Sequence, residues 1–529
     1  MLEIAIVGGG LCGLALARRL HGAGHKVALF EARQRLGGRI VTARSPANGL
    51  ALDLGPSWVW PDTQPRLAGL TAELGLSLFP QHDEGATLVL NDPDKTPARQ
   101  DSDGVHGNAH RVAGGMGQIV DALTAALPAE ALFTGHVLTA LRDEGDFITL
   151  RFHVGEAAIE IAARQVVLAL PPRLLAENVE FTPALDPAVS EAMGAAGTWM
   201  ATQAKVLLAY PYAAWRANGC SGNAFVTHEQ AVLGEVFDAC DKSGVKAALG
   251  GFLALDPAQR AAFSVGLPML MDNQVTQLFG AGLEQGEQHF LDWATEPFTC
   301  AARDLEAPRT HEDGDVASPL LRRGLWDGKL YLGGSETAAM AAGYLEGALD
   351  AAARIEAALA GPPATAEPDA SLGKANAMSL SLFSAWVAAQ SEPALDQYRA
   401  RVNRALAAQE RDQLTQRALL AVLEEIYAEA LDVLGGLSFD GTGIPIERGK
   451  SALTAHVQAP FGPFMKTLVD DVVAFNRTSC ALSNFPDEHK PSKLYMQTIL
   501  RDLAAAWQEF SLGANRLLIA KAAPASESM

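Results

Sequence analysis

The sequence predicts an α/β protein with a Rossmann-like domain at its N-terminus and a mainly helical region at its C-terminus. Three observations lead to this prediction. An apolar strand, residues 4–7, runs directly into a glycine-rich turn. A second apolar strand, residues 26–30, ends in an acidic residue. After residue 378, apolar side chains recur at helical spacing.

The glycine-rich turn has the spacing G-x-G-x-x-G at Gly8, Gly10 and Gly13, followed by an expected helix over residues 14–20. In such a turn the first glycine permits the sharp bend and the second lets the backbone approach a pyrophosphate. The third lets the helix pack closely on the strand. Phosphates then lie at the helix N-terminus. A glycine-rich turn without a ligand is the alternative interpretation.

The second strand ends at Glu31, about 20 residues beyond the glycines, where an acid binds a ribose hydroxyl in dinucleotide-binding folds. Because strand, turn, helix and acid occur in the required order, we expect a bound dinucleotide.

Composition narrows the class of protein. A chain of 529 residues with 49% hydrophobic and 19% charged residues should form two or three globular domains. A net charge of -20 argues against nucleic acid or an anionic membrane as partner. No stretch is long and apolar enough to span a bilayer, and the N-terminus lacks a signal-peptide pattern, so we expect a cytoplasmic protein. The five scattered cysteines and the twelve histidines predict neither disulfides nor a metal site.

Six further segments of the sequence bear on which dinucleotide is bound. Residues 32–39 continue from Glu31 with three arginines and a pair of glycines. They are followed in order by the segments 52–59, 111–116, 136–137, 166–172 and 330–348. This series resembles the flavin-containing amine oxidase superfamily over residues 1–360. The resemblance implies FAD as cofactor, rather than a nicotinamide dinucleotide.

The resemblance also assigns cofactor-binding positions. They are Gly8, Gly10, Gly13, Glu31, Arg33, Gly38, Arg39, Gly55, Pro56, Ser57, Val137, Gly334 and Glu336. Pro56 stands where the family usually has glycine, which removes one backbone donor from the loop beneath the flavin.

The resemblance further implies a pocket shaped by Trp58, Lys205 and Tyr344, in which the lysine assists reoxidation of the flavin by oxygen. Lys205 lies in the apolar strand 204–210. A buried lysine must be partnered or have a lowered pKa. The alternative is a lysine whose head reaches solvent.

Arg303 stands where monoamine oxidases carry a second substrate-framing tyrosine, so we expect a two-ring frame to be missing. Two interpretations stay open. Arg303 could bind the carboxylate of an amino acid or acidic amine. Alternatively it is turned away, paired with Asp304 or Glu306. Ala302 replaces the cysteine that bonds the flavin in some relatives, which predicts non-covalent FAD.

Family topology implies that a Rossmann-like FAD-binding domain is interleaved with an α+β substrate domain. FAD-binding segments are expected at 1–62, 108–172 and 305–360, and substrate-domain segments at 63–107 and 173–304. Residues 361–377 read as a linker to a helical C-terminal domain, 378–529. Within it, apolar repeats predict helices around 419–434 and 496–510, separated by a loop over 435–463.

The expected activity is FAD-dependent oxidation of an amine to an imine, which hydrolyses to a carbonyl product, with O2 reduced to H2O2. Small-molecule amine and O2 are the expected partners, and the C-terminal domain could cap the active site or form a homodimer. The alternatives are an amino acid oxidase or desaturase on the same scaffold, and a non-catalytic flavoprotein that acts through its C-terminal domain.

Overall fold

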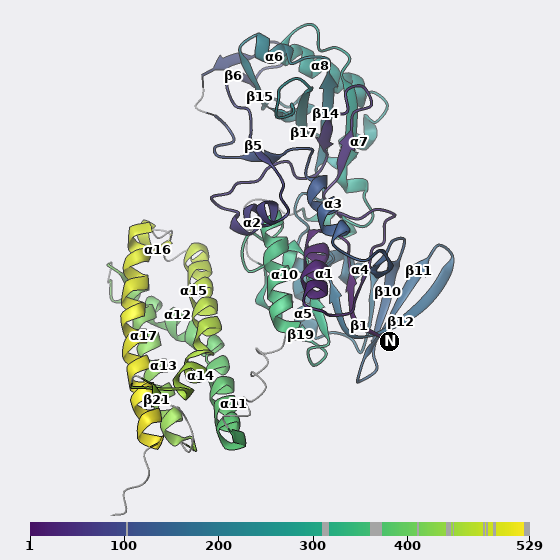
Figure 1. The fold of residues 1–529 in the computed structure, drawn as a ribbon. Coiled ribbons are helices and arrows are strands. Elements are labelled where there is room, and N and C mark those ends of the chain that lie inside the picture. The colour runs from purple at the N-terminus through teal and green to yellow at the C-terminus, as the bar shows by residue number, and fades with distance from the viewer. Residues whose placement is uncertain are drawn as a thin grey trace, which may run out of the picture. The chain divides into compact units, whose positions relative to one another are not determined.

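The computed structural model describes residues 1–101, 104–308, 317–359, 373–409, 412–440, 446–447, 449–479, 482, 485–489 and 493–522. The chain divides into two compact units, Met1–Leu359 and Ala360–Met529. The first is an α/β unit and the second is mainly helical, as predicted from the sequence (Figure 1).

The first unit contains a nine-stranded sheet. Its strands are β1 (Leu2–Val7), β2 (Val27–Phe30), β9 (Leu132–Phe133), β10 (Val137–Asp143), β11 (Ile148–Val154), β12 (Ala157–Leu168), β13 (Glu180–Thr182), β19 (Gly324–Leu325) and β20 (Leu330–Leu332). The main path runs β13-β10-β11-β12-β1-β2-β9, and β20 joins β12. The strands β2, β1, β12 and β20 are parallel neighbours, so their carboxyl ends meet at one edge. A ligand of an open α/β sheet binds at this edge.

Alternation along β1 explains why both faces of this sheet are covered. Ile4 and Ile6 pack with helices on one face, whereas Ala5 and Val7 belong to the core on the other. A parallel strand buried on both sides reads as an unbroken apolar run, as residues 4–7 do. The helix predicted at 14–20 lies within α1 (Leu11–Gly22), which runs beside α10 (Leu345–Leu359) (Figure 1).

A seven-stranded sheet forms the other part of the first unit and lies at the end away from β1 (Figure 1). Its order is β18 (Glu287–Asp292), β14 (Ala204–Tyr210), β17 (Ala247–Leu253), β16 (Leu233–Asp238), β15 (Cys220–Val226), β6 (Ala86–Leu90) and β7 (Ala98–Gln100). The two sheets therefore take alternate segments of the chain. β13 lies in the nine-stranded sheet although it follows the expected domain boundary at 172/173.

Shorter elements complete the first unit. The strand pairs are β3 (Thr42–Arg44) with β4 (Ala51–Asp53), and β5 (Leu78–Pro80) with β8 (His110–Val112). The remaining α-helices are α2 (Pro65–Glu73), α3 (Gly117–Ala125), α4 (Pro172–Asn178), α5 (Pro187–Ala195), α6 (Ala214–Ala217), α7 (Pro257–Ala262), α8 (Leu267–Phe279) and α9 (Ala302–Glu306). Single 3-10 turns are η1 (Ala129–Ala131), η2 (Trp293–Thr295), η4 (Pro319–Arg322) and η5 (Ser335–Thr337).

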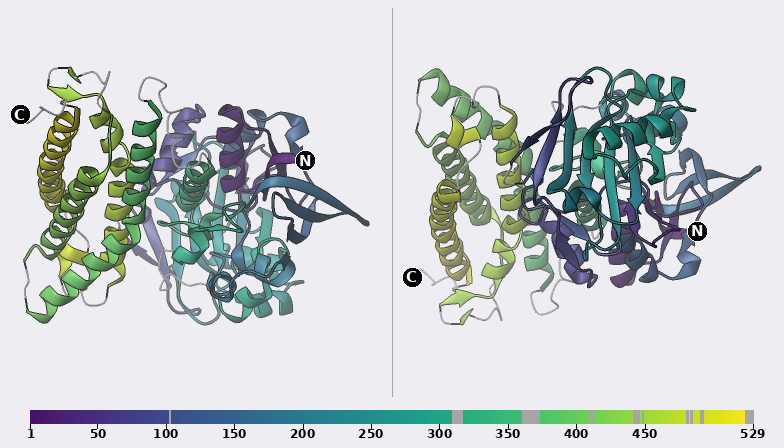
Figure 2. Two further views of the ribbon diagram at one scale, coloured as in Figure 1. Left: turned by 90° about the horizontal axis from the view of Figure 1, so that it is seen from below. Right: turned by 90° about the horizontal axis from the view of Figure 1, so that it is seen from above.

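The second unit is a set of helices that run alongside one another (Figure 2). They are α11 (Gly373–Ala389), α12 (Ser391–Ala407), α13 (Leu414–Gly436), α14 (Leu453–Gln458), α15 (Phe461–Thr478), α16 (Pro486–His489) and α17 (Lys493–Ala522). The helices predicted around 419–434 and 496–510 are confirmed as α13 and α17. Residues 361–372 of the predicted linker lie outside the described residues.

The loop predicted over 435–463 is only partly correct. The strands β21 (Ile446–Glu447) and β22 (Lys450–Ser451) and the helix α14 fall inside it, and α15 begins there at Phe461. Glycines and prolines suggested loop, but Leu453, Val457 and Phe461 are buried in the core of this unit and hold the short elements in place. Among the helices that the structure describes, none has the length and apolarity needed to cross a membrane.

Candidate active site

The glycine-rich turn connects β1 to α1, and its three glycines are needed for different reasons. Gly8 has φ +109°, and a Cβ there would lie 2.3 Å from the carbonyl oxygen of Ala169. A Cβ on Gly13 would lie 2.0 Å from the carbonyl oxygen of Gly8. At Gly10, by contrast, the nearest heavy atom to such a Cβ is 4.0 Å away, and the residue lines a cavity. Packing therefore requires Gly8 and Gly13, whereas Gly10 leaves room for a ligand against the backbone.

Glu31 closes this turn from the end of β2. It is 4% exposed, and its carboxylate accepts hydrogen bonds from the backbone N–H of Gly9 at 2.8 Å and of Arg33 at 2.9 Å. The Arg33 guanidinium in turn donates to Glu296 at 3.0 Å and to Thr299 at 2.8 Å. These contacts fix the acid beside the turn, where a ribose hydroxyl would reach it.

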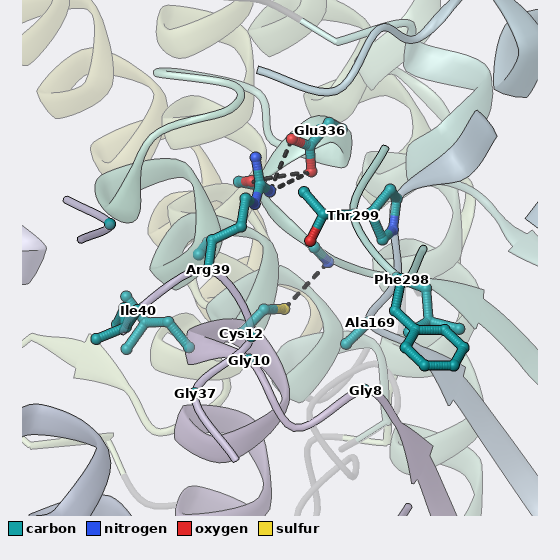
Figure 3. Close-up of a pocket in the computed structure, with 18 of the residues that line it drawn as sticks. Gly8, Gly10, Cys12, Gly37, Arg39, Ile40, Ala169, Phe298, Thr299 and Glu336 are labelled. Atoms are coloured by element: carbon teal, nitrogen blue, oxygen red, sulfur yellow. Dashed lines mark hydrogen bonds and ion pairs between the residues drawn. The ribbon is translucent and has the colours of Figure 1, made fainter. Parts of the chain in front are cut away.

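A second turn at the edge of the cavity follows β20 and contains Gly334 and Glu336. Glu336 is 2% exposed and forms an ion pair of 2.8 Å with Arg39 (Figure 3). Burial by itself would raise the pKa of Glu336, but Arg39 and Ser335 together hold the pKa below its ordinary value. Arg39 also donates to the carbonyl oxygen of Trp199 at 3.1 Å.

Both turns border one cavity of about 760 Å³. Its lining includes every cofactor-binding position expected from the sequence except Gly13, which packs against Gly8 instead. Figure 3 shows this end of the cavity, with Gly8 and Gly10 on the glycine-rich turn, Gly37 beside Gly10, and Arg39 meeting Glu336. The cavity continues to Trp58, Lys205 and Tyr344, so the structure brings these three expected site residues together with the turns.

Lys205 projects from β14 and is 2% exposed. Its ammonium donates to the carbonyl oxygen of Gly55 at 2.8 Å and to Ser57 Oγ at 2.6 Å. Burial lowers the pKa of Lys205 to about 7. Of the two alternatives expected from the sequence, the structure has the first. Lys205 is buried and hydrogen-bonded, and its head does not reach solvent.

Aromatic rings form the walls around this end of the cavity. Trp58 donates from Nε1 to Gln81 at 2.9 Å and packs edge-on against Phe237 at 4.7 Å between centroids. Tyr344 lies 5.3 Å from Trp199, centroid to centroid, with the rings tilted by 37°. A second ring therefore does accompany Tyr344, but it comes from the segment before β14 and not from position 303.

Placing Arg303 in the active site needs correction. The residue is exposed on the short helix α9 and is not among the residues that line the cavity. Its guanidinium lies beside Gly194. A Cβ built on Gly194 would be only 2.8 Å from Arg303 Nη1. Asp304, one of its two expected partners, forms a buried ion pair with Arg173 at 2.7 Å instead. The side chain is thus turned away from the cavity, because α9 is oriented by Asp304.

Sequence reasoning missed Trp199, Met200 and Gln203, which line the cavity. Asp304 holds their segment by accepting from the N–H of Thr198 at 2.9 Å. Met200 has φ +61°, a conformation that a side chain other than glycine rarely adopts. No motif marks this segment, although a tryptophan six residues before the lysine was a visible signal. Within the described part of the chain, no group of three or more His, Cys, Asp or Glu side chains could hold a metal ion.

Comparison with known proteins identifies the class. The family model described as flavin containing amine oxidoreductase matches residues 11–98 and 90–358. The match covers more than half of the chain, which therefore belongs to this family. FAD is the cofactor of the family, as the sequence predicted, and the residues found here fit it. Gly10 leaves an open approach, two turns border one cavity, and the acid Glu31 lies in its lining beside the glycine-rich turn.

Individual relatives agree with this family. The chain is 23% identical to putrescine oxidase of Kocuria rosea over 437 residues, which are 63% of this chain and 85% of that protein. It is 40% identical to AofH of Mycobacterium tuberculosis over 88 residues, 17% of this chain and 19% of that protein. It is 46% identical to rat flavin-containing amine oxidase B over 77 residues, 15% of this chain and 14% of the rat protein. The last two matches span less than a fifth of the relatives' lengths.

Solved structures share the fold. Putrescine oxidase bound to putrescine has a TM-score of 0.54 and 21% identity, covering 67% of this chain and 98% of the other. Cyclohexylamine oxidase from Brevibacterium oxydans IH-35A has a TM-score of 0.54 and 18% identity, covering 68% and 99%. In both comparisons about a third of this chain is left without a counterpart.

Proposed function

We propose that this protein is a FAD-dependent oxidase that converts an amine to an imine, which water hydrolyses to a carbonyl product, while O2 is reduced to H2O2. Bound FAD supplies the hydride acceptor. The observation that carries the proposal is one cavity that joins the dinucleotide turn to a buried lysine, Lys205, between aromatic walls.

The chain's own residues would hold the cofactor, orient the substrate and keep water away from the reacting end of the cavity. Gly10 and the Arg39–Glu336 pair offer the backbone and charge that a diphosphate needs. Trp58 and Tyr344 supply apolar faces that exclude water from the reacting end. An amine must be neutral for its nitrogen lone pair to assist hydride departure from the neighbouring carbon. Lys205, with its pKa lowered to about 7, can exist as a neutral amine in this setting.

The lining favours an amine whose remaining body is uncharged. Of the described residues lining the cavity, the carboxylates are Glu31, bonded to the backbone, and Glu336, paired with Arg39. Neither is free to bind a second ammonium group. The lining arginines are Arg33 and Arg39, both paired with glutamates, so neither is free to bind a substrate carboxylate. With Arg303 turned away, an amino acid substrate loses its main support.

Non-covalent attachment of FAD is part of the proposal. Cys300, two residues from the position that bonds the flavin in some relatives, is not among the cavity-lining residues. Burial raises the pKa of the Cys300 thiol to about 11, which makes it a poor nucleophile at neutral pH. Acid denaturation should release the yellow cofactor into the supernatant. Flavin that stays with the polypeptide would contradict this attachment.

Anaerobic mixing of the oxidised flavoprotein with a panel of amines tests the activity. We expect loss of the flavin's visible absorbance with monoamines that have apolar bodies, followed by peroxide formation when O2 is admitted. Reduction by amino acids alone would favour an amino acid oxidase. Reduction by no member of either panel would favour a desaturase or a non-catalytic scaffold acting through residues 378–529. A cytoplasmic location and a homodimer stay predictions, testable by fractionation and light scattering.

A further inference from the structure

We propose that Ser57 is a proton relay, whose hydroxyl carries a proton from a substrate ammonium group in the cavity to the amine of Lys205. The inference rests on the amine oxidation proposed above and adds to it a route by which a protonated substrate becomes neutral. Both residues line the cavity, and both are buried, Ser57 at 3% and Lys205 at 2% exposure.

The hydrogen bond between the two residues can run in either direction. In the structure Lys205 Nζ donates to Ser57 Oγ at 2.6 Å. When the lysine is neutral, its lone pair can accept the hydroxyl proton of Ser57 across the same distance. Among the residues that the structure describes, the Ser57 hydroxyl donates to no acceptor, and Lys205 Nζ is the group hydrogen-bonded to its oxygen. The oxygen of Ser57 keeps a second lone pair for a donor in the cavity.

The backbone around Ser57 holds this arrangement rigidly. Gly55 cannot be replaced, because a Cβ there would lie 2.0 Å from the carbonyl oxygen of Arg39. Pro56 has a fixed φ and disfavours the α conformation at Gly55. The Gly55 carbonyl and the Ser57 hydroxyl therefore flank the proline and both face the same amine, at 2.8 and 2.6 Å. The proline that departs from the family pattern thus stiffens the contact on which the relay depends.

The pKa of Lys205, lowered to about 7, gives the neutral amine a substantial population near neutral pH. Burial is the largest influence and lowers the pKa, and Arg111 lowers it further. Asp53 and Glu235 act in the opposite direction.

The two strands beside β14 add no further charge directly opposite the lysine. Lys205 faces Phe252 on β17 and Leu291 on β18. The acid at the end of β18, Asp292, is paired with Arg260 at 2.7 Å. The rings of Phe237 and Phe252 lie 5.2 Å from Nζ, and that of Trp58 lies 5.8 Å away.

The step balances. The substrate ammonium gives one N–H proton to Ser57 Oγ, as the Ser57 O–H proton moves to the lone pair of Lys205 Nζ. The substrate becomes a neutral amine, the lysine becomes an ammonium, and Ser57 is unchanged. One positive charge moves from substrate to lysine, and no oxidant is required.

The test is the pH dependence of anaerobic flavin reduction in wild type, Ser57→Ala and Ser57→Thr. At pH 7 a simple alkyl monoamine arrives protonated, so we expect Ser57→Ala to be slower by on the order of 100-fold. At pH 10 the amine arrives largely neutral, and the rate of Ser57→Ala should come within about twofold of the wild-type rate. Ser57→Thr keeps the hydroxyl and should restore the rate at pH 7. A loss of equal size at both pH values would overturn the relay, because a structural defect has no such pH dependence.

A second measurement does not depend on turnover. In flavin-free protein, the pH dependence of reductive methylation of Lys205, read by mass spectrometry, should shift to lower pH in Ser57→Ala. The variant lacks one acceptor for the ammonium form, which lowers the pKa. An unchanged labelling curve would contradict the coupling. If wild-type flavin is reduced by no amine, the proposed function fails. If it is reduced and Ser57→Ala matches it at pH 7, only the relay fails.

Discussion

The nucleotide end and the lysine end of the cavity are built in different ways. At the nucleotide end, backbone turns and buried charges dominate: the glycine-rich turn lies beside Glu31, and Arg39 pairs with Glu336 from a distant part of the sequence. At the lysine end, side chains form the walls, and they come from three parts of the chain: Trp58, Trp199 with Lys205, and Tyr344. The first end serves a ligand common to a whole family, whereas the second must suit one substrate. Backbone geometry tolerates almost no change, and side chains can be exchanged, so mutations at the two ends should have effects of different kinds.

The largest effect is expected at the nucleotide end. Gly13→Val would push a side chain against the Gly8 carbonyl oxygen, which a Cβ alone approaches to 2.0 Å. We expect a cost of about 3 kcal/mol or more and loss of bound flavin. Gly22→Ala on the same helix is the matched control, since a Cβ there meets nothing within 4 Å. Flavin content after purification measures cofactor binding, and thermal unfolding measures stability. Normal flavin content in Gly13→Val would contradict the distinction between the two ends of the cavity.

At the lysine end, Lys205→Met should leave flavin binding intact. Removal of the charged group beside the cavity is expected to slow reoxidation of reduced flavin by O2 on the order of 100-fold. Stopped-flow mixing of the reduced protein with oxygenated buffer measures this step alone. An oxidation rate equal to that of the wild type would remove the role given to Lys205.

The next effect concerns the rings. Trp199→Ala removes the partner that lies 5.3 Å from Tyr344. We expect KM for a monoamine to rise about tenfold with flavin content unchanged, because a hydrophobic contact in a pocket is worth 1–3 kcal/mol. Trp199→Phe should recover most of the loss. A fall in kcat at constant KM would place Trp199 outside substrate binding.

A smaller effect is predicted for stability against pH. The pKa of Lys205 is about 7 in the folded protein, against an ordinary value of 10.5 in the unfolded chain. As pH falls from 10.5 towards 7, the unfolded chain takes up a proton that the folded protein does not, so the wild type loses stability. The variant Lys205→Met has no titrating group at this position, so it does not lose stability in this way. Its thermal midpoint should exceed that of the wild type by more at pH 7 than at pH 10, and an equal difference at both would contradict the lowered pKa.

The smallest effect is predicted for Arg303→Ala. The side chain is exposed and lies outside the cavity lining, so kcat/KM should stay within about twofold of wild type. Asp304→Ala is the informative contrast, because its carboxylate holds Arg173 and the N–H of Thr198. Loss of activity in Arg303→Ala would contradict this prediction and would indicate that Arg303 contributes to the active site.

The features that could be predicted from the sequence lie mainly at the nucleotide end of the cavity, and those that could not lie mainly at the lysine end. The turn at Gly8 and the place of Glu31 directly after β2 were predictable because local spacing sets them. The apolar strand around Lys205 left open whether its head is buried or reaches solvent, and only the tertiary structure shows that it is buried. Trp199 could not be predicted, because its position depends on a hydrogen bond from Thr198 to Asp304, 106 residues away. The orientation of Arg303 depends on the same tertiary contact. In the helical unit, the short elements between 436 and 463 were missed because core packing outweighs their glycines and prolines.

The central claim is that one cavity holds FAD at its nucleotide end and an amine with an uncharged body at its lysine end. Anaerobic stopped-flow mixing of the flavoprotein with matched alkyl monoamine, diamine and amino acid tests it directly. We predict rapid bleaching of the flavin by the monoamine and much slower bleaching by the other two. Bleaching that is fastest with the diamine or the amino acid would contradict the assignment of Glu31, Glu336, Arg33 and Arg39 as paired groups unavailable to substrate.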